Sequence, residues 1–112
     1  MRVFSGQVPW LLQRLTALFL IAALLVICVV IFLGLLPDYS SWKAFAKSSH
    51  GATIVFVSYL AICTHAWIGA RDVLLDYVKP ISLRLTLLVA ISLLLTATAI
   101  RLLLILGAQL PV

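Results

Sequence analysis

Apolar residues along the chain fall into three long blocks that charged residues separate. Residues 15–36 hold no charged side chain, and residues 51–70 hold no Lys, Arg, Asp or Glu. Residues 85–100 form a third apolar run, which resumes at 102–110 after Arg101. Because a helix needs about 20 apolar residues to cross a hydrocarbon core about 30 Å thick, this pattern predicts three transmembrane helices, at about 15–36, 51–73 and 84–108.

Arg101 leaves a second interpretation of the third block open, in which the helix is broken or lies at the membrane interface. Arg101 follows Arg84 by 17 residues. At a rise of about 1.5 Å per residue, a continuous helix brings it close to the far side of the membrane, where its long stem can extend to the headgroups. We therefore expect a continuous third helix. The apolar runs do not alternate with polar residues, which argues against a β-barrel.

The composition excludes a water-soluble fold. Of the 112 residues, 65% are hydrophobic and 10% are charged, and the mean hydropathy is +1.28. Soluble domains are about half apolar and about a quarter charged, so lipid must cover much of this chain. We expect an all-α integral membrane protein with one domain over residues 1–112, within a larger helical bundle. Cys28 and Cys63 lie in the apolar runs without a metal-binding or redox spacing, and we expect buried thiols.

The basic residues predict how the chain is oriented in the membrane. The segment around the start of the first span and the second loop carry five of them, Arg2, Arg14, Arg71, Lys79 and Arg84, whereas the first loop carries Lys43 and Lys47. Because basic residues accumulate on the cytoplasmic side, we expect a cytoplasmic N-terminus and a periplasmic C-terminus in a bacterial inner membrane. The net charge of +5 then reflects topology and contact with anionic phospholipid, and it does not require a nucleic-acid partner.

Cap and turn residues mark where the spans begin and end. Residues 42–49 predict a short interfacial helix, and Ser48 and Ser49 are candidate caps for the second span. Pro80 ends any helix that reaches Lys79, because proline lacks an N–H group and restricts the residue before it.

Several polar residues of the second span fall on one face of the predicted helix. At about 100° per residue, Ser58, Gly69, Asp72 and Asp76 all return to within about 40° of His65. The rest of this span is mostly Ile, Val, Ala, Leu and Phe. A polar stripe on a membrane helix faces protein or a cavity rather than lipid.

His65 admits two interpretations. It is either a neutral histidine hydrogen-bonded to a neighbouring helix, or a ligand for a metal or a haem iron. In the second case, Gly69 leaves room for a flat macrocycle near the backbone. His50 lies about 22 Å away along the helix axis, so a haem held by two histidines needs its other ligand from a second chain. Three helices also enclose a haem poorly, which again indicates a partner chain.

Asp76 and Tyr77 raise a separate question. They are either an ordinary helix end at the membrane surface, with Tyr77 in the aromatic belt, or a site for a polar ligand. A phenolic O–H can donate a hydrogen bond to a carbonyl, and a neighbouring carboxylate can hold water or relay a proton. A quinone that takes up two electrons and two protons needs both functions. Lys79 and Arg84 fit contacts with lipid headgroups.

The residues of this stretch resemble a known family. The motif H-A-W-I-G-x-x-x-V-L-x-D-Y-V-K-P begins at His65, and S-L-R-L follows it up to Leu85. It resembles the small hydrophobic membrane anchor, or D chain, of bacterial succinate dehydrogenase. The length, the three-helix layout and the run from Arg14 through Thr16 to Ala17 are also similar to that family.

The resemblance implies a membrane-bound complex of a flavoprotein, an iron–sulfur subunit, a cytochrome b anchor and this chain, known as respiratory complex II. It implies that succinate is oxidised at FAD, as in the tricarboxylic acid cycle, and that electrons pass through iron–sulfur clusters to ubiquinone. Haem b would lie between the two anchors with one axial histidine from each. The chain would not be catalytic alone. A trimer of such heterotetramers is compatible with the resemblance.

The same resemblance assigns roles to individual residues. It implies that His65 is the axial ligand of the haem iron, that Tyr77 hydrogen-bonds the quinone, and that Asp76 borders the quinone site. Arg14 and Arg71 are weaker candidates for contact with haem propionates or lipid phosphate. Arg71 falls at a position that varies in the family.

Two other functions remain open at this point. An anchor of a fumarate reductase would have the same fold and similar partners. A small membrane transporter, or an anchor without enzymatic function, would also contain a buried histidine, but not as a haem ligand. The three apolar blocks contain no Asp or Glu, which argues against proton-coupled export. Arg101, late in the third span, is unusual for such a lipid-exposed place.

Overall fold

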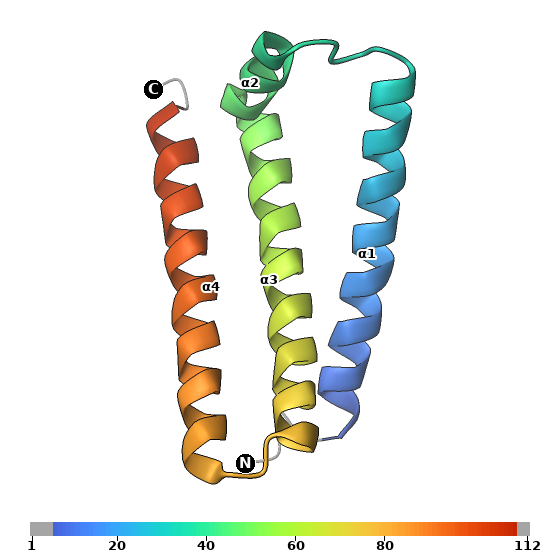
Figure 1. The fold of residues 1–112 in the computed structure, drawn as a ribbon. Coiled ribbons are helices and arrows are strands. Elements are labelled where there is room, and N and C mark those ends of the chain that lie inside the picture. The colour runs from blue at the N-terminus through green and yellow to red at the C-terminus, as the bar shows by residue number, and fades with distance from the viewer. Residues whose placement is uncertain (1–5, 110–112) are drawn as a thin grey trace.

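A computed structural model describes residues 6–109, and this part of the chain is entirely helical, without a β-strand (Figure 1). Helix α1 spans Gln7–Phe32, α2 spans Tyr39–Lys47, α3 spans Ser49–Tyr77 and α4 spans Ile81–Gln109. The three long helices are each apolar and long enough to cross a membrane. The prediction of an all-α protein with three membrane spans is therefore confirmed. Arg2, which entered the orientation argument, lies outside the described residues.

Helix α3 lies between the other two long helices (Figure 1). Helices α1 and α4 each pack along α3, and within residues 6–109 they do not contact each other. The short helix α2 packs on α3 and also contacts α4. Helix α3 is therefore the one of the three long helices that contacts both of the others.

The first helix differs from the predicted span 15–36 at both ends. It begins at Gln7, so Arg14 lies two turns inside the helix and does not precede it. It ends at Phe32 because Gly34 adopts the left-handed conformation, with φ 65°. The Gly34 N–H donates to the Ile31 carbonyl (3.1 Å) and the Leu35 N–H donates to the Val30 carbonyl (3.1 Å). Those two bonds form a Schellman cap, for which glycine is the favoured residue.

The first loop contains the predicted interfacial helix, which starts three residues earlier than expected. Asp38 caps α2, because its Oδ1 accepts bonds from the Ser41 backbone N–H (2.8 Å) and from the hydroxyls of Ser41 (2.6 Å) and Ser40 (2.9 Å). These bonds, led by the Ser41 hydroxyl, lower the pKa of the Asp38 carboxyl. Ser48 caps α3 by accepting from the Gly51 N–H at 3.0 Å, which confirms it as a cap.

The turn between α3 and α4 is fixed by proline and by an arginine. Helix α3 ends at Tyr77, four residues beyond the predicted end at 73 and three before Pro80. Arg84 Nε donates to the Val78 carbonyl at 3.0 Å, which satisfies an acceptor that the helix end leaves free. Helix α4 then begins at Ile81 and runs through Arg101 to Gln109. The broken-helix interpretation of the third block is therefore wrong.

Very little of the described chain is buried within itself. The buried apolar side chains are Pro9, Ala52, Ile68 and Leu106, whereas large Leu, Ile, Val and Phe side chains are exposed along all three long helices. Cys28 is exposed on α1 and Cys63 is half-buried, so the expectation of two buried thiols is wrong for the chain by itself. Burial of such apolar surface normally dominates folding, so lipid and other chains must cover these faces.

Basic residues of the described chain lie toward both of its ends. The α3–α4 turn lies at the same end as the start of α1, whereas α2 lies at the other end (Figure 1). The first end carries four of the described basic residues, Arg14, Arg71, Lys79 and Arg84, and the other end carries three, Lys43, Lys47 and Arg101. The cytoplasmic N-terminus stays a prediction.

The contact between α2 and α3 gives a first testable prediction. A Cβ atom added at Gly51 would lie 1.7 Å from the Phe45 carbonyl oxygen, whereas one added at Gly107, near the end of α4, would meet nothing within 4 Å. We expect Gly51→Ala to force α2 off α3 and to destabilise the chain by about 1–3 kcal/mol, as overpacking does. Gly107→Ala should be neutral or stabilising, because alanine favours helices.

Thermal unfolding of the detergent-solubilised chain, followed by circular dichroism, measures this difference. The transition temperature should fall for Gly51→Ala and hold or rise for Gly107→Ala. Equal transitions for the two variants would contradict the packing of α2 on α3 described above.

Candidate functional site

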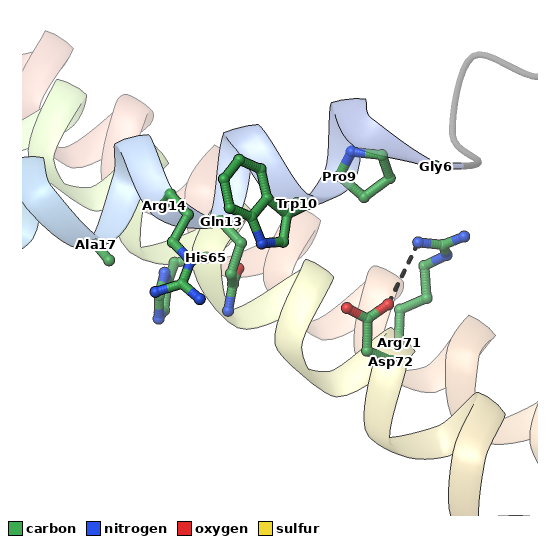
Figure 2. A pocket seen from close by; sticks show the side chains of 9 residues that line it. All are labelled: Gly6, Pro9, Trp10, Gln13, Arg14, Ala17, His65, Arg71 and Asp72. Atoms are coloured by element: carbon green, nitrogen blue, oxygen red, sulfur yellow. Dashed lines mark hydrogen bonds and ion pairs between the residues drawn. The ribbon is translucent and has the colours of Figure 1, made fainter.

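An open hollow of about 630 Å³ lies between the first half of α1 and the second half of α3 (Figure 2). Two arginines, an aspartate and a histidine give it polar chemistry, and the remaining walls are largely apolar. The residues that line it are Gly6, Pro9, Trp10, Gln13, Arg14, Ala17, His65, Arg71 and Asp72. The predicted site residues His65, Arg14 and Arg71 thus come together, although His65 and Arg14 are 51 positions apart in the sequence.

His65 is half-buried in this hollow and joins α3 to α1. Its Nδ1 lies 3.1 Å from the Thr16 hydroxyl oxygen. The Thr16 hydroxyl is also 2.7 Å from the carbonyl oxygen of Leu12, one turn earlier in α1. Within the described residues His65 Nε2 has no recorded hydrogen-bond partner. One ring nitrogen is therefore engaged by the protein and the other is available to a ligand.

Arg14 brings positive charge to the same hollow. Its guanidinium carbon lies 5.5 Å from the centre of the Trp10 ring, one turn earlier in α1. A guanidinium over the face of an indole is attracted by the ring quadrupole. Trp10 is 60% exposed, so the pair stands on the open side of the hollow, where Arg14 can meet an anionic group.

Arg71 and Asp72 form the polar end of the hollow. Arg71 Nη1 lies 3.4 Å from Asp72 Oδ1, as the dashed line in Figure 2 marks. The Asp72 side chain is 58% exposed, and an exposed ion pair contributes little to stability. Part of the Arg71 charge is nevertheless offset by Asp72, so Arg14 offers the less compensated cation.

Gly69 has a different role from the one expected. A Cβ atom at this position would lie 3.3 Å from Gln13 Nε2 on α1. The space that we expected to receive a flat macrocycle is thus occupied by a side chain of this same chain. Gly69 lets α1 approach α3 closely near His65. Gln13 Oε1 is buried there, without a hydrogen-bond partner in the described structure.

Asp76 and Tyr77 lie outside the hollow, in the last turn of α3. Asp76 is exposed and Tyr77 is 79% exposed. Because α3 is a continuous helix through Tyr77, Asp76 lies about 16 Å along the axis from His65, at 1.5 Å per residue. The structure therefore brings together only part of the predicted polar stripe: His65 and Asp72 share the hollow, and Asp76 is not among its lining residues.

Sequence reasoning did not identify several residues of the site. Thr16 had been noted only for its resemblance to the family, and Trp10 and Gln13 had not been considered. Asp72 had been assigned to the stripe but not to the site. A helical wheel relates residues within one helix, and the pairing of Thr16 with His65 across two helices leaves no comparable signal in the sequence.

The hollow is suited to a group that takes one ligand from this chain. In the part of the chain that the structure describes, no three His, Cys, Asp or Glu side chains gather as a metal site. What the hollow offers is a single imidazole nitrogen and two guanidinium groups. An imidazole is a ligand for iron, and guanidinium groups bind carboxylates. An iron macrocycle with acidic substituents fits this donor set, provided that a second chain completes its coordination.

Comparisons with known proteins identify a family for this chain. Residues 3–100 match the family described as succinate dehydrogenase/fumarate reductase transmembrane subunit. A protein of Coxiella burnetii, named succinate dehydrogenase hydrophobic membrane anchor subunit, is 32% identical over 92 residues, which cover 80% of this chain and 78% of that relative. The three membrane spans and both matches lead to one conclusion: this multi-pass membrane chain belongs to the family of succinate dehydrogenase/fumarate reductase transmembrane subunits.

Proposed function

We propose that this chain is the hydrophobic anchor subunit of a succinate:ubiquinone oxidoreductase, respiratory complex II, in a bacterial inner membrane. Its partners would be a cytochrome b anchor, an iron–sulfur subunit and a flavoprotein that carries FAD. The observation that carries the proposal is the state of His65, which has one ring nitrogen bonded to Thr16 and the other available in an open hollow. A histidine that only joined two helices would not require open space beside its second ring nitrogen.

In this proposal His65 Nε2 is one axial ligand of haem b. When bound, haem b supplies a one-electron redox centre between the two anchors. A histidine of the cytochrome b anchor would provide the second ligand, since this chain offers one. Arg14 would meet a haem propionate or a lipid phosphate from its place over Trp10, and Arg71 would do so more weakly because Asp72 offsets its charge.

Tyr77 and Asp76 would form one wall of the ubiquinone site. The Tyr77 hydroxyl would donate a hydrogen bond to a quinone carbonyl, and the Asp76 carboxylate would hold a water molecule that delivers protons. Oxidation of succinate to fumarate releases two electrons and two protons, and reduction of ubiquinone to ubiquinol takes up two of each. The exposure of Tyr77 and Asp76 at the end of α3 supports this role, because both groups are open to a ligand and to water.

The orientation of the chain follows from the same assignment. The end with Lys79 and Arg84 would face the cytoplasm, where the soluble subunits oxidise succinate, and the N-terminus would lie on that side. The C-terminus would then be periplasmic. Lys79 and Arg84 would hold the quinone wall at the level of the headgroups. Arg101, near the opposite end of α4, would extend to the periplasmic surface.

The family match favours the anchor over a small transporter. The family description names both succinate dehydrogenase and fumarate reductase. The Coxiella burnetii relative bears the name of the first enzyme, and on this ground we assign succinate oxidation. Electron transfer from succinate is expected only in the assembled complex.

Replacement of His65 tests the haem assignment. In the complex co-expressed with its partner subunits, His65→Ala should abolish the b-type signal in the reduced-minus-oxidised optical spectrum, because the iron loses an axial ligand. His50→Ala is the matched control, since His50 is an exposed histidine at the other end of α3. Haem content should stay unchanged in the control. An unchanged spectrum in His65→Ala would show that the ligand lies elsewhere.

Removal of one hydroxyl tests the quinone wall. Tyr77→Phe should lower succinate:ubiquinone reductase activity about fivefold, the effect of losing one hydrogen bond of about 1 kcal/mol. Succinate oxidation by an artificial dye that takes electrons from the soluble subunits should be preserved. Tyr39→Phe, at an exposed tyrosine on α2, should affect neither assay. Equal losses in both assays, or none in either, would count against Tyr77 as a quinone contact.

A further inference from the structure

We infer that Thr16 on α1 is a positioning residue for His65: its hydroxyl accepts a hydrogen bond from His65 Nδ1–H and so presents Nε2, unprotonated, to the iron. This inference rests on the proposed function, in which His65 ligates haem. It adds a residue from a different helix to the haem site. Thr16 would act through His65 and would not contact the iron.

The direction of the hydrogen bond follows from counting hydrogens. A threonine hydroxyl has one hydrogen and two acceptor lone pairs. Thr16 Oγ1 lies 2.7 Å from the Leu12 carbonyl oxygen and 3.2 Å from that of Gln13. These carbonyls can only accept, and the Leu12 carbonyl lies nearer to the hydroxyl than His65 Nδ1 does (2.7 Å against 3.1 Å), which favours pointing the single hydroxyl hydrogen at the carbonyl. The contact of 3.1 Å with His65 Nδ1 then needs its hydrogen from the imidazole.

The tautomer of His65 follows from the donor. A neutral imidazole carries one N–H, so a protonated Nδ1 leaves the Nε2 lone pair free to bind a metal. The opposite tautomer would place the hydrogen on Nε2 and would leave Nδ1 facing an oxygen with no hydrogen to give. The contact with Thr16 therefore selects the form of His65 that can ligate iron through Nε2.

The same contact also fixes the orientation of the ring. Histidine ligands commonly donate their other N–H to a nearby acceptor, which orients the ring. Thr16 is suited to this role for two reasons. A β-branched side chain is stiff about χ1. The hydrogen bond from its hydroxyl to the Leu12 carbonyl, one turn earlier, also holds the hydroxyl in place. Both residues are at least partly buried where α1 meets α3, so close packing of the two helices, which Gly69 permits, sets the distance between them.

The test uses variants of Thr16 in the complete complex. Thr16→Val keeps the shape of the side chain and removes the acceptor, and Thr16→Ser keeps the hydroxyl. We expect Thr16→Val to raise the midpoint potential of the haem, because an imidazole without its hydrogen-bond acceptor donates less electron density to the ferric iron. The variant complex should also retain its haem about tenfold less tightly, as measured by transfer of haem to apomyoglobin. Tenfold is about the lower end of the loss in affinity that follows when a ligating histidine loses its hydrogen-bond partner. Thr16→Ser should restore both properties.

Two further variants make the result specific. Thr86→Val is the control. It removes a similar hydrogen bond within a helix, from the Thr86 hydroxyl to the Ser82 carbonyl (2.8 Å), at a threonine that has no histidine partner. This variant should leave the haem unchanged. If Thr16→Val fails to assemble, Thr16→Ala removes the same acceptor without the branched side chain and should give the same two changes.

The outcomes separate this inference from the proposed function. If Thr16→Val and Thr16→Ala match the wild type in potential and haem retention, while His65→Ala loses the haem, the role of Thr16 is wrong and the haem assignment stands. If His65→Ala keeps its haem, both are overturned. If Thr16→Ser behaves like Thr16→Val, the effect comes from packing, and the role of the hydroxyl is again wrong.

Discussion

The hydrocarbon core of a membrane offers no water to polar side chains, and this constraint decides where the polar chemistry of the chain can lie. A buried donor or acceptor that finds no partner within the protein costs free energy. In the described structure side-chain hydrogen bonds join α3 to α1 through His65 and Thr16, and to α4 through Tyr59 and Thr98. The apolar surface, in contrast, is left almost entirely to lipid and to other chains.

The arrangement of the helices explains why the two sides of α3 differ. Because α3 lies between α1 and α4, two of its faces meet different helices. The face toward α1 carries His65 and opens into a hollow with Arg14 and Arg71, whereas Tyr59 faces α4. The hollow is open on one side and is lined by α1 and α3 alone. In the proposed function, a second chain would close it.

Much of the fold could be predicted from the sequence, because the length and polarity of a membrane span are properties of one continuous segment. The three spans, the interfacial helix, the Ser48 cap and the turn before Pro80 follow from local patterns. The early end of α1 at Gly34 could also have been recognised, since glycine favours left-handed helix caps. The start of α1 at Gln7 was missed because the prediction followed the apolar run, which begins after Arg14.

The site was predictable only in part, because its geometry depends on contacts between helices. His65, Arg14 and Arg71 were identified from the sequence and lie in one hollow. The helical wheel also placed Asp76 on the face of His65, but Asp76 does not line the hollow. An angle around the helix does not show how far the hollow extends along α3. The partner of His65 and the contact of Gly69 with Gln13 depend on how α1 sits against α3. Such packing is set by many side chains at once and not by any one motif.

The central claim, that this chain supplies one axial ligand of a haem shared with a second anchor, is tested most directly by a cryo-electron microscopy structure of the assembled complex. The account predicts continuous density from His65 Nε2 to the haem iron, a histidine of the partner anchor on the opposite face, and His65 Nδ1 at hydrogen-bonding distance from Thr16. A haem whose two axial ligands both come from other chains would contradict it, as would a complex with no haem beside His65.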